Sequence, residues 1–214
     1  MHLALVVGLL LISALPTSQP DQNFRFVEDV VRCLKDIRDT RESRVQGEER
    51  LSNREKNFVF AFTLQGSAEA ISERMETWKS SKDARVREAA EHLIRAATSL
   101  RALGEAISSL LKGNGDSDEH SARFRVATRV AKDTLEKMMV SVASLATNED
   151  SRRVLPLTSD EKALIVRRIE SLFVTDMNAY AAASPEERKD YILEPELFAV
   201  LALRNIYARE LNAK

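Results

Sequence analysis

Apolar and small side chains recur every seven residues between Val86 and Leu111, and this spacing constrains the fold more than any other feature of the sequence. The intervals alternate between four and three through Val86, Ala90, Leu93, Ala97, Leu100, Gly104, Ile107 and Leu111. Such intervals place all of these side chains on one face of an α-helix, and that face is stable in water only when other helices cover it. The segment therefore predicts a long helix within a helical bundle.

Small residues alternate with large ones along this segment, since Ala90, Ala97 and Gly104 stand between leucine and isoleucine positions. A glycine inside a helix costs about 1 kcal/mol relative to alanine, and a closely packed neighbour would compensate for that cost. We therefore expect another helix backbone to lie against Gly104. We also expect this helix to be the central one of the bundle.

Further segments carry signals for the start of a helix. Ser52 with Glu55, and Thr158 with Glu161, have the spacing of a capping box, in which each side chain binds an unpaired backbone N–H of the first turn. Ser184, followed by Pro185 and two glutamates, is a third such signal. The expected helices span approximately 23–44, 52–78, 80–112, 117–146, 158–180, 184–193 and 195–211, with a break near Ser80 between the second and the third.

The start of the second segment also fits a β-strand, because Phe58, Phe60, Phe62 and Leu64 alternate with a period of two. No other segment offers a partner strand, and the apolar positions that follow have the helical period. We interpret the segment as a helix and expect Phe58 and Phe62 to widen its buried face.

These patterns predict an all-α fold, an up-and-down antiparallel helical bundle. Four long helices, the second through the fifth, would form the bundle, and the N-terminal helix and two shorter C-terminal helices would cover its ends or sides. With only 6 Gly and 5 Pro in 214 residues, the sequence has few of the turn signals of a β fold. We expect residues 21–214 to form a single domain.

Residues 1–20 have the layout of a signal peptide, in which an uncharged apolar run from Leu3 to Leu15 precedes a small or polar stretch. The run is preceded by no Lys or Arg and followed by no clear A-x-A cleavage site, so an uncleaved anchor and a cytosolic apolar tail remain as alternatives. We expect a secreted or periplasmic protein. The rest of the chain has no segment apolar enough to span a membrane.

The formal net charge of −1 gives no electrostatic signal for nucleic-acid binding. The single cysteine, Cys33, excludes a disulfide within the chain, and we interpret it as a small apolar residue of the first helix. Pairing between chains and a reactive thiol are the alternatives for Cys33.

The sequence carries no recognised catalytic, metal or cofactor motif, and we predict no cofactor. A di-iron bundle needs Glu-x-x-His on two helices, but Ala89 and Ser117 stand three residues before His92 and His120. Phosphate-binding glycine loops and nucleophile motifs are also absent. We expect both histidines to lie on the surface.

The leading hypothesis is a non-enzymatic interaction, scaffold or accessory protein with a protein partner or a second copy of itself. The helix from Pro195 to Lys214 is apolar around much of its circumference, so it is either deeply packed or part of an interface. Its candidate contact residues are Leu197, Phe198, Leu201, Ile206 and Tyr207.

A small-molecule carrier or sensor is the second hypothesis, and an enzyme of unfamiliar type is the third. The residues that would line an apolar pocket are Phe58, Phe62, Trp78, Met138, Met139 and Phe173, with Asp176 beside them. Trp78 is also interpretable as a core residue whose indole N–H reaches water. Asp176 lies beside an apolar stripe and would need a partner if it were buried.

Overall fold

The computed structural model describes residues 21–45, 52–112, 117–145, 155–188 and 194–213. Within these ranges the chain is helical and contains no strand, so the predicted all-α fold is confirmed. The helices are α1 (Gln22–Val45), α2 (Asn53–Glu76), α3 (Ala84–Lys112), α4 (Ser117–Ser144), α5 (Ser159–Leu172), α6 (Val174–Ala182) and α8 (Pro195–Asn212).

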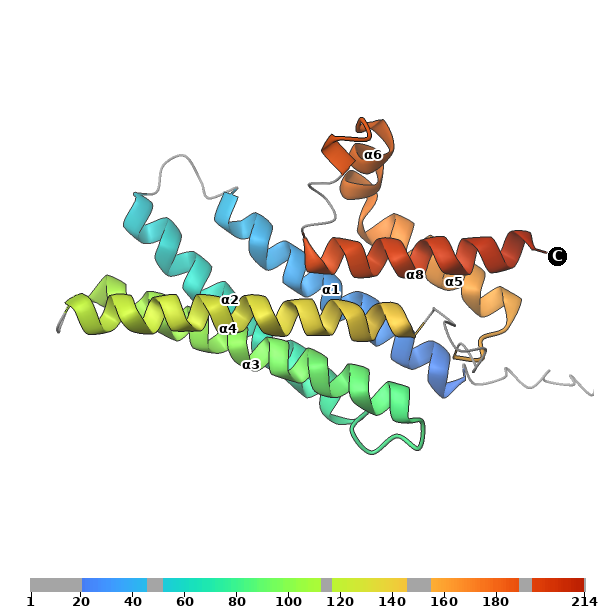
Figure 1. Ribbon diagram of the computed structural model, residues 1–214, viewed down its shortest axis with the longest axis horizontal. Helices are drawn as coiled ribbons and strands as arrows, with labels where there is room; N and C mark the ends of the chain where they lie inside the picture. Colours follow the sequence, from blue (N-terminus) through green and yellow to red (C-terminus); the bar gives the residue numbers. More distant parts are fainter. Residues whose placement is uncertain (1–20, 46–51, 113–116, 146–154, 189–193, 214) are drawn as a thin grey trace, which may run out of the picture.

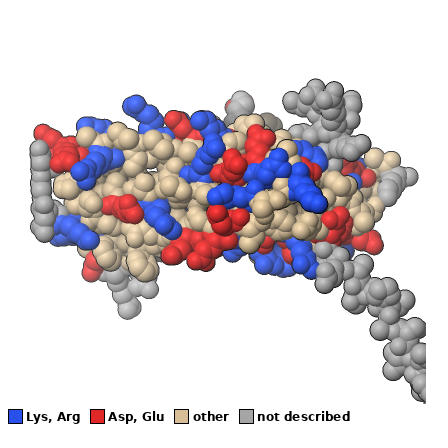
Figure 2. Space-filling model, turned by 90° about the horizontal axis from the view of Figure 1, so that it is seen from below, with Lys and Arg blue, Asp and Glu red and all other residues tan. Residues whose placement is uncertain are grey.

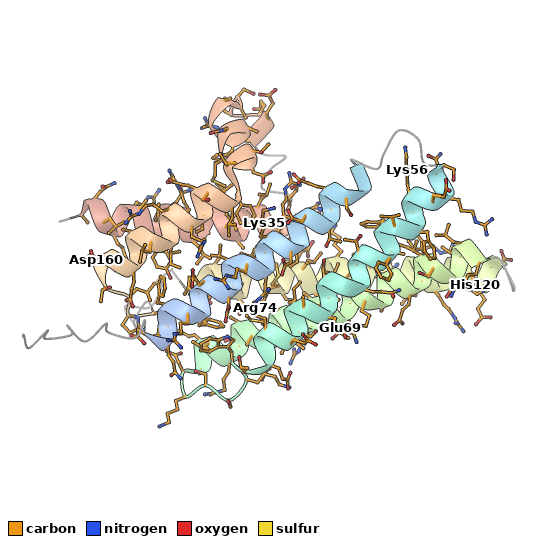
Figure 3. All side chains as sticks on the ribbon, turned by 180° about the vertical axis from the view of Figure 1, so that it is seen from behind. Lys35, Lys56, Glu69, Arg74, His120 and Asp160 are labelled. Carbon is orange, nitrogen blue, oxygen red and sulfur yellow. The ribbon has the colours of Figure 1, made fainter. Side chains whose placement is uncertain are left out.

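Six of these helices form two layers. One layer contains α5, α1 and α2, and the other contains α8, α4 and α3, so that each helix contacts its neighbours around a closed ring (Figures 1 and 3). Successive helices from α1 to α4 run in alternating directions, as an up-and-down bundle requires (Figure 1). The short helix α6 lies at the edge and follows α5 directly.

The four longest described helices are α1 to α4, with 24, 24, 29 and 28 residues. The prediction that the second through the fifth helices would be the long ones is therefore wrong by one position. The expected fifth helix is divided at Phe173, whose backbone (φ −117°, ψ 31°) leaves the helical conformation and separates α5 from α6. The β-branched Val174 and Thr175 follow at once, and such residues stabilise a helix less than unbranched ones do.

The N-terminal helix α1 is a core helix and not the outer cover that we expected. Phe26, Val27, Val30, Val31, Cys33, Leu34 and Ile37 are each no more than 2% exposed. They are buried because α1 contacts α2 and α5 in its own layer and α8 in the other. The third helix, which we expected to be central, contacts α2 and α4 at the corner of the ring.

The expected close approach at Gly104 is confirmed. A Cβ atom added to Gly104 would lie 2.7 Å from the carbonyl oxygen of Ala61 in α2, which is too close for any side chain. The glycine therefore allows the backbones of α2 and α3 to meet.

Both predicted capping boxes are present, at Ser52 with Glu55 and at Thr158 with Glu161. The break between α2 and α3 is also present. The cap of α3 is Asp83, since its Oδ1 accepts from the backbone N–H of Arg85 at 2.9 Å. The start signal at Ser184 has its reciprocal bonds with Glu187, but residues 189–193 of the expected sixth helix lie outside the described residues.

Candidate functional site: a groove along α4

An open groove of about 1340 Å³ follows α4 from Thr128 to Ser144. At 1.5 Å per residue this stretch of helix is about 24 Å long. Residues of α3 line the groove along with α4, and Phe60 of α2, Arg41 of α1 and Pro195 of α8 complete it. Five helices thus contribute to one elongated depression.

The lining of the groove combines apolar and charged residues. Its apolar members are Phe60, Leu100, Leu103, Ala131, Leu135, Met139, Val140 and Pro195. Charges of both signs accompany them, since Lys132, Asp133, Glu136 and Lys137 of α4 are exposed to solvent. This composition resembles that of a protein interface, where apolar contacts are bordered by polar ones.

A buried ion pair lies beside Pro195. The side chain of Glu196 is fully buried, and its Oε1 accepts from Nη1 of Arg41, which is 40% exposed and lines the groove. Burial raises the pKa of Glu196 above its ordinary value, although the charge of Arg41 opposes the shift. Among the described residues, Oε2 of Glu196 has no hydrogen-bond partner. Arg41 therefore presents a cation to the groove and neutralises a carboxylate beneath it.

A second buried pair holds α6 against α1. Asp176 is buried, and its Oδ1 accepts from Nε of Arg38 at 3.0 Å and from Nη2 of the same side chain. The expectation that a buried Asp176 would need a partner is confirmed. The guanidinium of Arg38 compensates for the burial of the Asp176 carboxylate. The ion pair therefore has a structural role, since it joins α6 to α1.

The residues predicted to line one pocket lie in different parts of the molecule. Only Met139 lines the groove, while Met138 and Phe173 are buried in the core. Phe58 and Phe62 are 53% and 73% exposed, so the expectation that they widen the buried face of α2 is wrong. Phe62 lies on the side of α2 away from its buried residues, and Phe58 lines a shallow depression with Leu111 and Lys112 of α3.

Trp78 has the role of a core residue with a polar contact. Its indole N–H donates to Oδ2 of Asp29 at 3.0 Å, and its ring meets Phe26 edge-on with 5.3 Å between the centroids. These contacts join the turn that follows α2 to the first half of α1. Trp78 is half-buried and packs against the core, and its indole N–H is bound by a carboxylate where we expected water.

The candidate contact residues of the last helix are largely buried within the chain. Leu197, Leu201 and Tyr207 belong to the core, and Phe198 and Ile206 are half-buried. Of the two alternatives, deep packing is what the structure shows, since α8 contacts α1, α4 and α5. The three core side chains are not accessible to a partner in this conformation.

Cys33 is buried in α1, and burial raises the pKa of its thiol to about 12. A thiol with such a pKa is almost wholly protonated at neutral pH and is a poor nucleophile. His92 is half-buried and lines the groove, and His120 is half-buried near the start of α4. The described ranges contain no group of three or more His, Cys, Asp or Glu residues that could hold a metal ion.

The sequence patterns did not predict the groove. Leu100 was expected on the core face of its helix, but nothing in the sequence indicated that it lines one groove with Arg41 and Pro195. A sequence signal for such a groove would have been an apolar stripe on one helix that is wider than the neighbouring helices can cover.

The fold and the groove together define the class of this protein as an all-α helical bundle with an open, mostly apolar groove. Comparison with protein-family models, with curated proteins and with solved structures found no match. No helix in the described part of the chain is both long enough and apolar enough to cross a membrane.

Proposed function

We propose that this protein is a non-enzymatic interaction module that binds an amphipathic helix of a partner protein in the groove along α4. The observation that carries the proposal is the groove itself, whose apolar lining follows about 24 Å of α4. A helix of about four turns matches this length. Recognition of an amphipathic helix by an apolar groove is a common mode of protein binding.

The shape of the groove favours a polypeptide over a small molecule. Ligand pockets for small molecules enclose most of the ligand and have volumes of about 300–1,000 Å³. This groove is larger and lies open to solvent. The exposed charges beside it, Lys132, Asp133, Glu136 and Lys137, suit a partner helix whose polar face carries both signs.

The face of the molecule shown in Figure 2 gives no support to a polyanion as the partner. Lys and Arg alternate with Asp and Glu across the face shown in Figure 2. The formal net charge of −1 agrees with this mixture. Nucleic-acid binding would require a concentrated basic surface.

Selection from a displayed library of helical peptides tests the proposal. Selection against the native protein is expected to enrich peptides with an apolar stripe and mixed charges on the other face. Met139→Glu places a charge in the groove and is expected to weaken the enriched peptides at least about tenfold. Thr98→Glu is the matched control, because Thr98 is exposed on α3 and does not line the groove. The proposal is wrong if no peptide is enriched, or if the enriched peptides bind both variants equally.

We also propose that the protein acts outside the cytoplasm after removal of its first residues. The support for this is the uncharged apolar run from Leu3 to Leu15, which lies outside the described residues. The intact mass of protein isolated from its own host is expected to lack this run. A mass that includes Met1 to Pro20 would contradict the proposal.

A further inference from the structure

The segment that precedes α1 joins the described chain beside one end of the groove along α4. Asn23, at the start of α1, donates from its side-chain amide to the backbone oxygen of Pro156 at 3.5 Å. The backbone N–H of Leu155 donates to the oxygen of Leu145 at 3.4 Å, and the residue before Leu145, Ser144, lines the groove. The start of α1 and the end of α4 therefore lie at the same end of the bundle (Figure 1).

A short connector is sufficient to bring the preceding segment to the groove. Residues 1–20 lie outside the described residues, and positions 16–20 separate the apolar run Leu3–Leu15 from Asp21. Five residues extend over at most about 18 Å. The path from Asn23 to Ser144 crosses only two hydrogen bonds and two peptide links. A connector of this length is therefore long enough to reach the Ser144 end of the groove.

The apolar run Leu3–Leu15 matches the groove in length and in chemistry. It has 13 residues and no charged side chain. As a helix it would be about 20 Å long, and the groove follows about 24 Å of α4. The apolar lining, which includes Leu135, Met139 and Val140, would bury one face of such a helix. The run is too short to span a bilayer, which needs about 20 apolar residues. The groove is thus an apolar environment of the length that this run requires.

We propose that the run Leu3–Leu15, as long as it is attached to the chain, occupies the groove along α4 and keeps a partner helix out. The inference rests on the proposed function, since it assigns the run and the partner helix to the same site. It adds a regulation of that site: the groove becomes accessible only when the first residues are removed.

Attachment makes even a weakly bound run effective as a competitor. A connector of a few residues gives the run an effective concentration of about millimolar size at the groove. A partner helix at about 1 µM must then bind about a thousandfold more tightly than the run to displace it. The run has no polar face, so only the side turned towards the groove is buried and its own affinity is low. Separation from the chain therefore dilutes the run and frees the groove.

Photo-crosslinking within the full chain, without any partner, tests where the run lies. The chain is made by cell-free synthesis so that residues 1–20 are retained. A photoreactive residue at Val140 is expected to form an adduct with residues 3–15, located by mass spectrometry of the digested chain. Val140 is exposed and lines the groove, so its replacement leaves the core intact. Thr98 is the matched control, because it is exposed on α3 and does not line the groove. An equal mixture of isotopically labelled and unlabelled chains shows whether an adduct forms within one chain.

Two charges placed in the run test whether it excludes a partner helix. The double variant Leu9→Asp with Leu10→Asp is expected to expel the run, because an apolar groove binds carboxylates poorly. Thr17→Asp with Gln19→Asp is the matched control, since it adds the same charge to the connector. A helical peptide selected for the groove is expected to bind the first double variant at least about tenfold more tightly than it binds the unchanged full chain or the control. Circular dichroism verifies that each variant keeps its helical content.

The inference is overturned if the photoreactive residue at Val140 forms no adduct with residues 3–15, if the one at Thr98 forms the same adduct, or if the adducts join different chains. It is also overturned if the peptide binds the unchanged full chain and the first double variant equally, an outcome that leaves the proposed function intact. If no peptide binds any of these chains, the proposed function fails, and the adduct at Val140 alone decides whether the run occupies the groove.

Discussion

Two glycines in this chain stand in opposite surroundings, although both lie inside helices. Gly104 is covered by the carbonyl oxygen of Ala61, whereas Gly66 faces open space. The same substitution should therefore have effects of opposite sign on the stability of the monomer. The intrinsic preference of the helix for alanine applies at both sites, but steric conflict applies only at Gly104.

Gly104→Ala is predicted to destabilise the protein by about 1–3 kcal/mol, because the new methyl group must displace a backbone oxygen and α2 has to move. Gly66→Ala is predicted to stabilise the monomer by about 1 kcal/mol. Urea unfolding of both variants, followed by circular dichroism, measures the two changes. A Gly104→Ala variant as stable as the native protein would show that the helices do not meet as described.

Glu196 gives a prediction about pH. Burial raises its pKa in the folded chain, so the folded state binds the proton more tightly than the unfolded state does. The contribution of this group to stability is therefore lost as pH rises from its ordinary value near 4.5 through the raised value. Glu196→Gln does not titrate, so its stability relative to the native chain is predicted to improve between pH 4 and pH 7.

Urea unfolding of both proteins at several pH values tests this prediction about Glu196. A difference in stability that stays constant with pH would contradict it. A gain by the native protein as pH rises would mean that Arg41 lowers the pKa of Glu196 more than burial raises it.

At the scale of the helices, the sequence patterns predicted which segments are helical better than they predicted what each helix contacts. Periodic apolar residues located α1 to α4, and the capping boxes at Ser52 and Thr158 located two helix starts. A stripe shows that a helix is covered but not what covers it, which is why the central place of α1 was missed. The exposure of Phe62 was missed for the related reason that an aromatic residue is expected inside.

The last helix shows the same limit of sequence patterns. It is apolar around much of its circumference, and this pattern is expected both of a helix in the core and of a helix at an interface. In the structure α8 supplies Leu197, Val200, Leu203 and Tyr207 to the core. Each large side chain removed from a core costs about 2–5 kcal/mol, and whole domains are stable by only about 5–15 kcal/mol. We therefore expect the fold to require α8.

Truncation after Glu194 is therefore predicted to abolish cooperative unfolding. Thermal denaturation followed by near-ultraviolet circular dichroism measures this loss. A matched control is the native chain with Asn212 and Ala213 replaced by Ser, because both residues are exposed at the end of the chain. A truncated chain with an unchanged melting transition would show that α8 is an accessory element.

At the scale of the whole molecule, the groove along α4 depends on how the two layers meet. Its lining unites Arg41, Phe60, Leu100, Ala131 and Pro195, which come from five helices. Contacts between residues so distant in sequence leave no local pattern, whereas caps and helical periods are local. For that reason the helices could be predicted and the groove could not.

The central claim is that a partner helix occupies this groove, and site-specific photo-crosslinking in the native host tests it most directly. A photoreactive residue at Met139 is predicted to form a discrete adduct with one partner polypeptide, attached along one face of a helix of that partner. The same residue at Thr98 is predicted to form none. The absence of an adduct at Met139, or an identical adduct at both positions, would contradict the claim.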